Sequence, residues 1–200
     1  QLPPDKAIGH RAALLAALAS GQTCVNPWPS AEDCQRTLGI VRALGARVSI
    51  DGEAALFEGA GSSGLRAPPK PLDCGESGTT FRLAAGVLAG QPFRSVLTAS
   101  PSLLRRPMRR IVDPLAQMGS SISGQSNPAN PGELFAPLSI EGRRPLKANR
   151  YEMPIASAQV KSAILFAGLF ADGPTTVIER QSTRDHTERA FQEFSISVSR

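Results

Sequence analysis

Residues 74–90, CGESGTTFRLAAGVLAG, open on a polar turn of Gly, Ser and Thr and then become apolar on all sides. A helix that is hydrophobic all round must be buried. Two other stretches have the same character: residues 2–11, LPPDKAIGHR, which lead into AALLAALA, and residues 156–161, ASAQVK, which lead into SAILFAGLFA. We therefore expect three buried apolar helices, over residues 11–21, 79–90 and 157–173.

Amphipathic helices and short β-branched strands alternate with these apolar helices. The amphipathic helices are expected over residues 31–45, with Ser30 as N-cap, 108–119 and 185–194. Strands are expected over residues 48–51, 55–58, 95–98, 120–123, 138–141 and 175–179, and a mobile loop over 125–137. The order strand, helix, strand, helix, strand, strand recurs about every 70 residues. This pattern predicts an α/β fold of three repeated βαβαββ units, with apolar helices inward and sheets outward.

The composition favours a compact protein with a small anionic partner. A chain of 200 residues with 41% hydrophobic content is long enough for one domain spanning residues 1–200. The net charge of +5 is spread along the whole chain without a long basic run, and aromatic residues make up only 5%. Nucleic-acid binding is therefore not expected, because little stacking surface is available.

Cysteines, histidines and apolar runs restrict the compartment and exclude metal chemistry. Cys24, Cys34 and Cys74 are odd in number and form no CxxC pair, which favours neither a disulfide framework nor a zinc site. His10 and His186 have no cluster of ligands around them in the sequence. No apolar run approaches the roughly 20 residues of a membrane span, and no export signal is recognisable. A cytoplasmic protein that binds neither metal nor membrane is expected.

Each apolar helix begins beside a Lys or Arg, which makes the helix starts candidate anion sites. A helix N-terminus carries backbone N–H groups without helical partners and about half a positive charge. Lys6 and Arg11 accompany the first start. Arg106 precedes Pro107 at the beginning of an amphipathic helix and is well placed for a ligand, whereas Arg109 and Arg110 are expected on its solvent face.

Five motifs in order resemble the family of 5-enolpyruvylshikimate 3-phosphate (EPSP) synthase, in its bacterial type that includes glyphosate-tolerant members. They are PPDKAIGHR, DCGESGTTFRLAAGVLAGQPF, RRPMRRIVDPLAQMG, ASAQVKSAILFAGLFADGPT and TRDHTER, and the match covers nearly the whole chain. The family enzyme is about twice this length and has two similar domains of three βαβαββ units each. The resemblance implies that this chain is the shikimate 3-phosphate-binding half, without its partner domain.

The activity implied by the resemblance is that of 3-phosphoshikimate 1-carboxyvinyltransferase in the shikimate pathway of aromatic amino acid biosynthesis. The enzyme transfers the enolpyruvyl group of phosphoenolpyruvate to the 5-hydroxyl of shikimate 3-phosphate and releases phosphate, with neither a metal nor an organic cofactor. Glyphosate is an inhibitor of the family. The proton-transfer residues would lie in the missing domain, so the chain alone is expected to bind substrate without turnover.

The resemblance also implies individual roles. Lys6 would contact both substrates and Arg11 would bind shikimate 3-phosphate. Gly78 would approach phosphoenolpyruvate through its backbone, which needs a residue without Cβ, and Arg106 would clamp that ligand. The shikimate 3-phosphate pocket would be lined by Ser157, Ala158 and Gln159, with Gln159 also reaching phosphoenolpyruvate, and closed by Thr183 and Arg184.

The chain departs from the family pattern at two further positions that lie beside these residues in the sequence. Ala7 stands where the family has a Ser that binds substrate phosphate, a loss of about 1–3 kcal/mol if nothing replaces the hydroxyl. Glu76 stands where the family has Asn, so it either points away from the anion-binding turn or changes selectivity between phosphoenolpyruvate and anionic inhibitors. The chain also has Pro4 for Gly, Gly9 for Ser, and Ala99 and Ser100 near a usual Gly-Asp.

Two alternatives remain open. A UDP-N-acetylglucosamine enolpyruvyl transferase shares the fold and chemistry, but DKAIGHR and RDHTER argue against it, and none of the cysteines lies in the expected mobile loop, where that enzyme has a reactive one. The other alternative is a non-catalytic anion-binding or RNA-binding module built on the same repeat.

Overall fold

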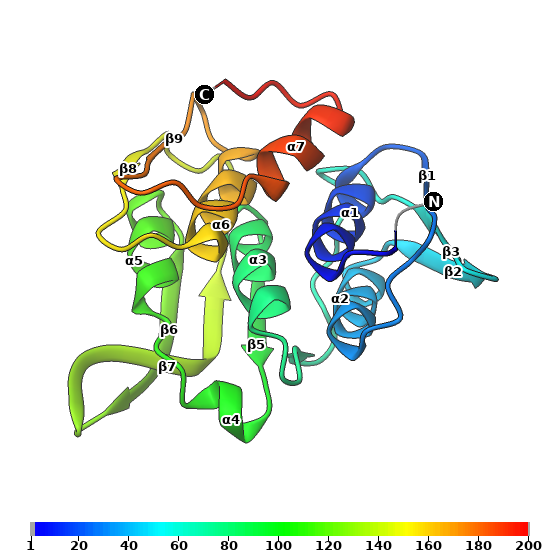
Figure 1. The fold of residues 1–200 in the computed structure, drawn as a ribbon. Coiled ribbons are helices and arrows are strands. Elements are labelled where there is room, and N and C mark those ends of the chain that lie inside the picture. The colour runs from blue at the N-terminus through cyan, green and yellow to red at the C-terminus, as the bar shows by residue number, and fades with distance from the viewer. Residues whose placement is uncertain (1–2, 200) are drawn as a thin grey trace. The chain divides into compact units, whose positions relative to one another are not determined.

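The structure is a computed structural model that describes residues 3–199. Leu2, the first residue of the LPPDKAIGHR stretch, lies outside the described residues. Contacts within the chain divide the described part into two compact units, residues 3–68 with 185–199 and residues 69–184 (Figure 1). We call them unit 1 and unit 2 and describe each by itself.

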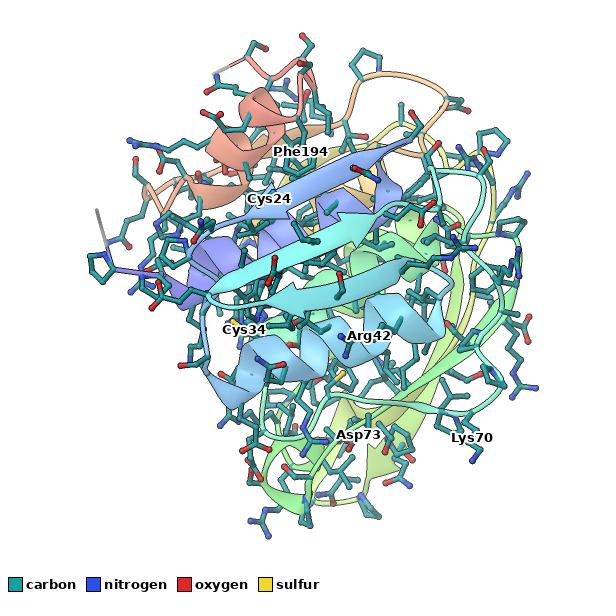
Figure 2. All side chains as sticks on the ribbon, turned by 90° about the vertical axis from the view of Figure 1, so that its right-hand side faces the viewer. Cys24, Cys34, Arg42, Lys70, Asp73 and Phe194 are labelled. Carbon is teal, nitrogen blue, oxygen red and sulfur yellow. The ribbon has the colours of Figure 1, made fainter. Side chains whose placement is uncertain are left out.

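Unit 1 is a three-stranded antiparallel sheet with helices packed against it. Its elements are α1 (Lys6–Leu18), β1 (Gln22–Val25), α2 (Glu32–Ala43), β2 (Arg47–Asp51), β3 (Ala54–Glu58) and α7 (His186–Glu193). The strand order is β1-β3-β2, and Figure 2 shows the three strands side by side, with Cys24 on β1 and Arg42 on α2. Helix α1 packs against α2, α7 and β3. Phe57 of β3 is buried and meets Trp28 edge to face at 5.8 Å between ring centroids.

Helix α1 begins earlier than the sequence predicts. Asp5 caps it by accepting a 2.9 Å hydrogen bond from the backbone N–H of Ile8, so the helix starts at Lys6 rather than near residue 11. An Asp at the N-cap satisfies an N–H that would otherwise lack a partner. One turn further on, Gly9 lies against a neighbouring ring: a Cβ there would be 2.7 Å from Cγ of Pro29. This part of α1 therefore has no room for a side chain at residue 9.

The N-cap predicted for α2 is wrong. Ala31, not Ser30, occupies the N-cap position, and no side chain there accepts a hydrogen bond. The acidic first turn is present as expected, with Glu32 and Asp33 near the positive end of the helix dipole. These two carboxylates favour the helix start without a side-chain cap.

Unit 2 contains the middle one of the three expected βαβαββ repeats and most of the predicted site residues. Its elements are β4 (Leu72–Asp73), α3 (Gly78–Ala89), β5 (Arg94–Thr98), α4 (Pro101–Leu104), α5 (Arg109–Gln117), β6 (Ser121–Asn127), β7 (Asn130–Glu141), β8 (Arg150–Glu152), α6 (Ala158–Gly168) and β9 (Thr176–Ile178). One sheet has the order β4-β5-β7-β6, with β4 and β5 parallel, and β8 pairs with β9 in parallel.

The apolar helices α3 and α6 pack directly against each other inside unit 2. Nearly every residue of α3 is buried, as expected for a helix without a polar face. The two backbones come so close that a Cβ at Gly86 would lie 2.2 Å from the carbonyl oxygen of Ala163. Only glycine fits at this crossing, which sets how closely the helix pair packs.

The α/β class and the buried apolar helices are confirmed, whereas several details differ from the expectations. Strands β1, β4 and β8 were not predicted, because runs of two to four residues carry no readable alternation. The expected mobile loop over 125–137 is wrong, because β6 and β7 form a hairpin there. Alternate burial of Ala136, Leu138 and Ile140 fixes β7, and the Gly, Ser and Pro content of the segment concealed that pattern. Among the described residues, the full six-element order occurs in the middle set, β4, α3, β5, α5, β6 and β7.

Replacing Gly86 tests the helix crossing. Gly86→Ala is expected to lower the free energy of unfolding by about 1–3 kcal/mol or more, because the added methyl group must push α3 and α6 apart. Gly39→Ala in α2 is the matched control: a Cβ there has no atom of another residue within 4 Å, so it should raise the free energy of unfolding by about 0.5–1 kcal/mol. Urea unfolding of both variants measures the difference, and equal effects would contradict the packing argument.

Candidate functional site

Lys6, the first predicted anion ligand, is exposed at the start of α1 in unit 1. Its Nζ donates a 2.7 Å hydrogen bond to Oδ2 of Asp33. This hydrogen bond and the charge of Asp33 raise the pKa of Lys6, so the ammonium group stays charged at neutral pH. Ala7 follows on the same turn and presents only a methyl group.

Arg11 is buried, with 3% of its surface exposed. Its Nε donates to Oγ1 of Thr187 at 2.6 Å, and its terminal nitrogen donates to the carbonyl of Ala7 at 2.7 Å. Arg11 therefore links α1 to α7 within unit 1. Thr187 was not among the predicted site residues, although it lies inside the TRDHTER motif.

His10 is fully buried beside Arg11 and is neutral at pH 7. Its Nδ1 lies 2.7 Å from Oγ1 of Thr37. Burial lowers the pKa of His10 to about 4, and the charge of Asp33 opposes this only in part. A neutral imidazole here avoids a further buried positive charge next to the guanidinium group.

Gly78 begins α3 in unit 2 and lies beneath two guanidinium groups. Ser77 caps the helix by accepting a hydrogen bond from the N–H of Thr80. A Cβ at Gly78 would lie 2.7 Å from a terminal nitrogen of Arg82 and 3.4 Å from one of Arg106. The position therefore excludes a side chain, as expected, and arginines of the chain itself occupy the space that this leaves.

Arg82 was missed by the sequence analysis as a site residue, although it ends the CGESGTTFR stretch. One of its terminal nitrogens donates to the carbonyl of Gly78 at 3.2 Å and to Oε1 of Gln159 at 2.9 Å. Nε2 of Gln159 in turn donates to Oγ1 of Thr79 at 3.0 Å. This network joins the starts of α3 and α6, and it brings together two residues that the sequence assigned to the site, Gly78 and Gln159.

The positive charge around Gly78 is concentrated and only partly compensated. Burial, together with the charges of Arg110 and Arg106, lowers the pKa of Arg82 to about 10. Among the residues that the structure describes, the side chains of Arg106 and Arg110 form no hydrogen bond or ion pair. Arg109 pairs with Asp113 at 3.3 Å, in keeping with its predicted position on the solvent face.

Glu76 is exposed, and its carboxylate binds the start of α4. Hydrogen bonds from Ser100 and Ser102 lower the pKa of Glu76, and the positive charges of Arg106 and Arg105 act in the same direction. Glu76 is therefore a carboxylate at neutral pH. It remains within the electrostatic reach of Arg106 while its hydrogen bonds go to serines.

The start of α6 presents Ser157, Ala158 and Gln159, as predicted. Ser157 is the N-cap and accepts a hydrogen bond from the N–H of Val160. Lys161, in the first turn of α6, is buried and forms a 2.8 Å ion pair with Glu179. No local pattern reveals this pair, because 18 residues separate its members in the chain.

Glu179 also binds one of the two residues expected to close the site. The hydroxyl of Thr183 donates to its second carboxylate oxygen, which holds the segment after β9 near α6, while Arg184 is exposed. A hollow of about 270 Å³ lies next to this network and is lined by residues 153–156 and 179–181. The segment before Ser157 and the segment before Thr183 therefore face a common hollow.

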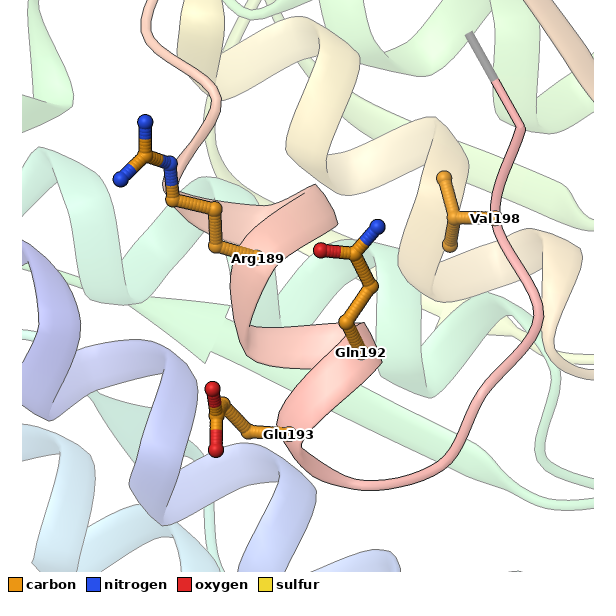
Figure 3. Close-up of a pocket in the computed structure, with 4 residues that line it drawn as sticks. All are labelled: Arg189, Gln192, Glu193 and Val198. Carbon is orange, nitrogen blue, oxygen red and sulfur yellow. The ribbon is translucent and has the colours of Figure 1, made fainter.

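A second hollow lies in unit 1 and contains none of the predicted site residues. It is lined by Arg189, Gln192 and Glu193 of α7 and by Val198 after it (Figure 3). Arg189 donates to Asp185 within the same helix turn. The predicted chemistry is therefore centred on the helix starts and not on this hollow.

Residues 3–199 contain no group of three or more His, Cys, Asp or Glu side chains placed to hold a metal ion. Within the same range, every helix is too short or too polar to cross a membrane.

The buried apolar helices α3 and α6 each begin at a serine cap, and Arg82 and Gln159 join their starts within an α/β fold. A sequence profile of the EPSP synthase (3-phosphoshikimate 1-carboxyvinyltransferase) family matches residues 1–200. The chain belongs to the EPSP synthase family.

Individual relatives agree with this assignment. The chain is 49% identical to the 3-phosphoshikimate 1-carboxyvinyltransferase of Geobacillus kaustophilus, over 99% of this chain and 45% of that protein. It is 48% identical to the enzyme of that name from Desulforudis audaxviator, over 100% of this chain and 45% of that protein. The solved structure of EPSP synthase from Acinetobacter baumannii matches with a TM-score of 0.94 at 41% identity, over 100% of this chain and 44% of that one. The chain thus spans less than half the length of these relatives.

The buried His10 predicts a pH dependence of stability. Its imidazole gains a proton near pH 6.5 in the unfolded chain but only near pH 4 in the folded one, so the unfolded state binds more protons between these values. The free energy of unfolding should fall by about 3 kcal/mol as the pH drops from 6.5 to 4. Urea unfolding across this range measures the loss. His10→Gln should flatten the profile, whereas the control His186→Gln should keep it steep; the reverse result would contradict the assignment.

Proposed function

We propose that this chain supplies the shikimate 3-phosphate-binding half of an enzyme that transfers the enolpyruvyl group of phosphoenolpyruvate to the 5-hydroxyl of that substrate. In this reaction the bond between C2 of phosphoenolpyruvate and its phosphate oxygen breaks, an ether bond to the 5-hydroxyl oxygen forms, and phosphate leaves with the hydroxyl proton. The observation that carries the proposal is the cluster of Arg82, Arg106 and Arg110 around the start of α3.

Phosphoenolpyruvate suits this cluster because it carries a phosphate and a carboxylate. Arg106 has a free planar guanidinium group, which can donate two parallel hydrogen bonds to either anion. Gly78 leaves room for the guanidinium groups of Arg82 and Arg106 at the start of α3, and the amide of Gln159 borders the same place from α6. We assign phosphoenolpyruvate to this position.

The ligands that we propose for shikimate 3-phosphate are described for each unit by itself. Lys6 and Arg11 supply positive charge in unit 1. In unit 2, Ser157, Ala158 and Gln159 supply a helix start, and Thr183 and Arg184 close the pocket. Because Arg11 is already bound to Thr187 and Ala7, its role in this proposal is to hold α1 and to supply positive charge at the start of that helix.

The other half of the enzyme is the main partner in this proposal. A complementary domain, as expected from the length of the relatives, supplies the proton-transfer residues and further phosphoenolpyruvate ligands, while residues 1–200 act as one domain. Glyphosate competes for the anion position. We place the enzyme in the cytoplasm, where the substrates of aromatic biosynthesis would reach it, and we assign it no cofactor.

Binding to the chain itself tests the proposal. Titration calorimetry should show weak binding of shikimate 3-phosphate and still weaker binding of phosphoenolpyruvate, because part of the ligand set for the latter is missing. Arg106→Gln should weaken phosphoenolpyruvate binding about tenfold, as expected for the loss of charged hydrogen bonds. The control Arg47→Gln removes an exposed arginine paired with Glu58 and should change nothing.

The same samples also test the division of labour between the halves. The chain alone should release no phosphate from the two substrates. Rapid turnover, tighter binding of phosphoenolpyruvate than of shikimate 3-phosphate, or binding of RNA with a steep salt dependence in place of both would each contradict the proposal.

Glu76→Asn tests selectivity in the full-length enzyme. The carboxylate of Glu76 repels anions near Arg106, and its serine hydrogen bonds keep it charged. Its replacement by a neutral amide should change the Michaelis constant for phosphoenolpyruvate and the inhibition constant for glyphosate to different extents. Both constants are measured on the same preparation, with Glu58→Gln as the exposed control. An unchanged ratio would mean that Glu76 takes no part in selectivity.

A further inference from the structure

Arg82 occupies a place where a positive charge is unfavourable. It is buried, with 8% of its surface exposed, and lies one turn into α3. Long side chains on a helix lean toward its N-terminus, so the guanidinium group reaches back to the carbonyl of Gly78 at the positive end of the helix dipole. Arg106 and Arg110 add two more positive charges nearby.

The partners of Arg82 are neutral. Its side chain donates to the Gly78 carbonyl and to Oε1 of Gln159, and among residues 3–199 it forms no ion pair with a carboxylate. An unpaired buried charge costs stability. Proteins usually keep a residue that lowers the stability of the fold in this way only where the residue serves a function.

The hydrogen bonds of Arg82 determine the orientation of the Gln159 amide. A guanidinium group can only donate, so the side of the amide facing Arg82 must be the oxygen. The amide nitrogen then faces Thr79 and donates to its hydroxyl at 3.0 Å. One N–H of the amide is used in this way, and the other is left for a ligand.

We propose that Arg82 is a positioning residue for the anion site: it fixes the Gln159 carboxamide with its oxygen inward and one N–H available to the bound anion. This inference rests on the proposed function, because it gives Gln159 a ligand. In the absence of Arg82 the amide is free to rotate, and its oxygen would then face and repel the anion. The effect of Arg82 on binding therefore passes through Gln159.

The orientation is tested without any ligand. In the free chain, the side-chain amide resonances of Gln159 should shift in Arg82→Met toward the positions of a solvent-exposed glutamine, because the hydrogen bond to Oε1 is lost. Arg94→Met is the matched control, because Arg94 is also in unit 2 and is hydrogen-bonded, to Ser139 on the neighbouring strand. If the Gln159 resonances are the same in Arg82→Met and in the wild type, the inference is wrong, whatever the chain binds.

A double-mutant cycle tests the effect on binding. Arg82→Met and Gln159→Met should each weaken phosphoenolpyruvate binding about tenfold. The double variant should be no weaker than the worse of the two, because the second change removes an interaction that is already lost. If the two losses of phosphoenolpyruvate affinity multiply in the double variant, Arg82 acts on the anion independently of Gln159, and the inference is wrong.

Arg82→Lys covers the case in which Arg82→Met does not fold. Lysine keeps the charge but lacks the planar fork, so it cannot hold Gly78 and Gln159 together. It should shift the Gln159 resonances and weaken phosphoenolpyruvate binding. Wild-type resonances and affinity in this variant would overturn the inference. If the wild-type chain binds neither anion, the proposed function fails, and the ligand-free resonances still decide the role of Arg82.

Discussion

The close approach of α3 and α6 is the constraint on which the site in unit 2 depends. Gly86 removes the side chain that would separate the two backbones, and Ala163 faces it with a carbonyl oxygen. Because the helices are held this closely, the first turn of α3 and the first turn of α6 are near enough for Arg82 to reach Gln159. A contact in the middle of the helix pair thus determines which polar groups meet at its ends.

The sequence was sufficient to predict the elements whose signal is local. All-round apolarity identified the buried helices, whereas the resemblance to a known family, and not a local pattern, indicated that Gly78 must lack a Cβ. The pairing of charges was not predictable. Arg82 meets Gln159 across 77 residues, and Lys161 meets Glu179 across 18, so neither pair has a local pattern that reveals it. For this reason neither Arg82 nor the pairing of Lys161 was predicted.

Competition between local signals explains the remaining differences. Ser30 is a good N-cap by type, but α2 begins two residues later, with Glu32 and Asp33 stabilising its first turn. The β6–β7 hairpin has a composition typical of loops, and only its pairing with β5 shows that β7 is a strand of the sheet. Residue type predicts which groups can form an element, whereas tertiary contacts decide which of them do.

The contact between Gly9 and Pro29 also has an evolutionary consequence. The resemblance implies Ser at the position of Gly9, yet in this chain the ring of Pro29 fills the volume that a Cβ would need. A mutation at residue 9 alone would create a steric clash, and a mutation at residue 29 alone would leave a void beside α1. The two positions should therefore vary together among homologues, and transplanting the serine-containing motif into this chain requires a compensating substitution at residue 29.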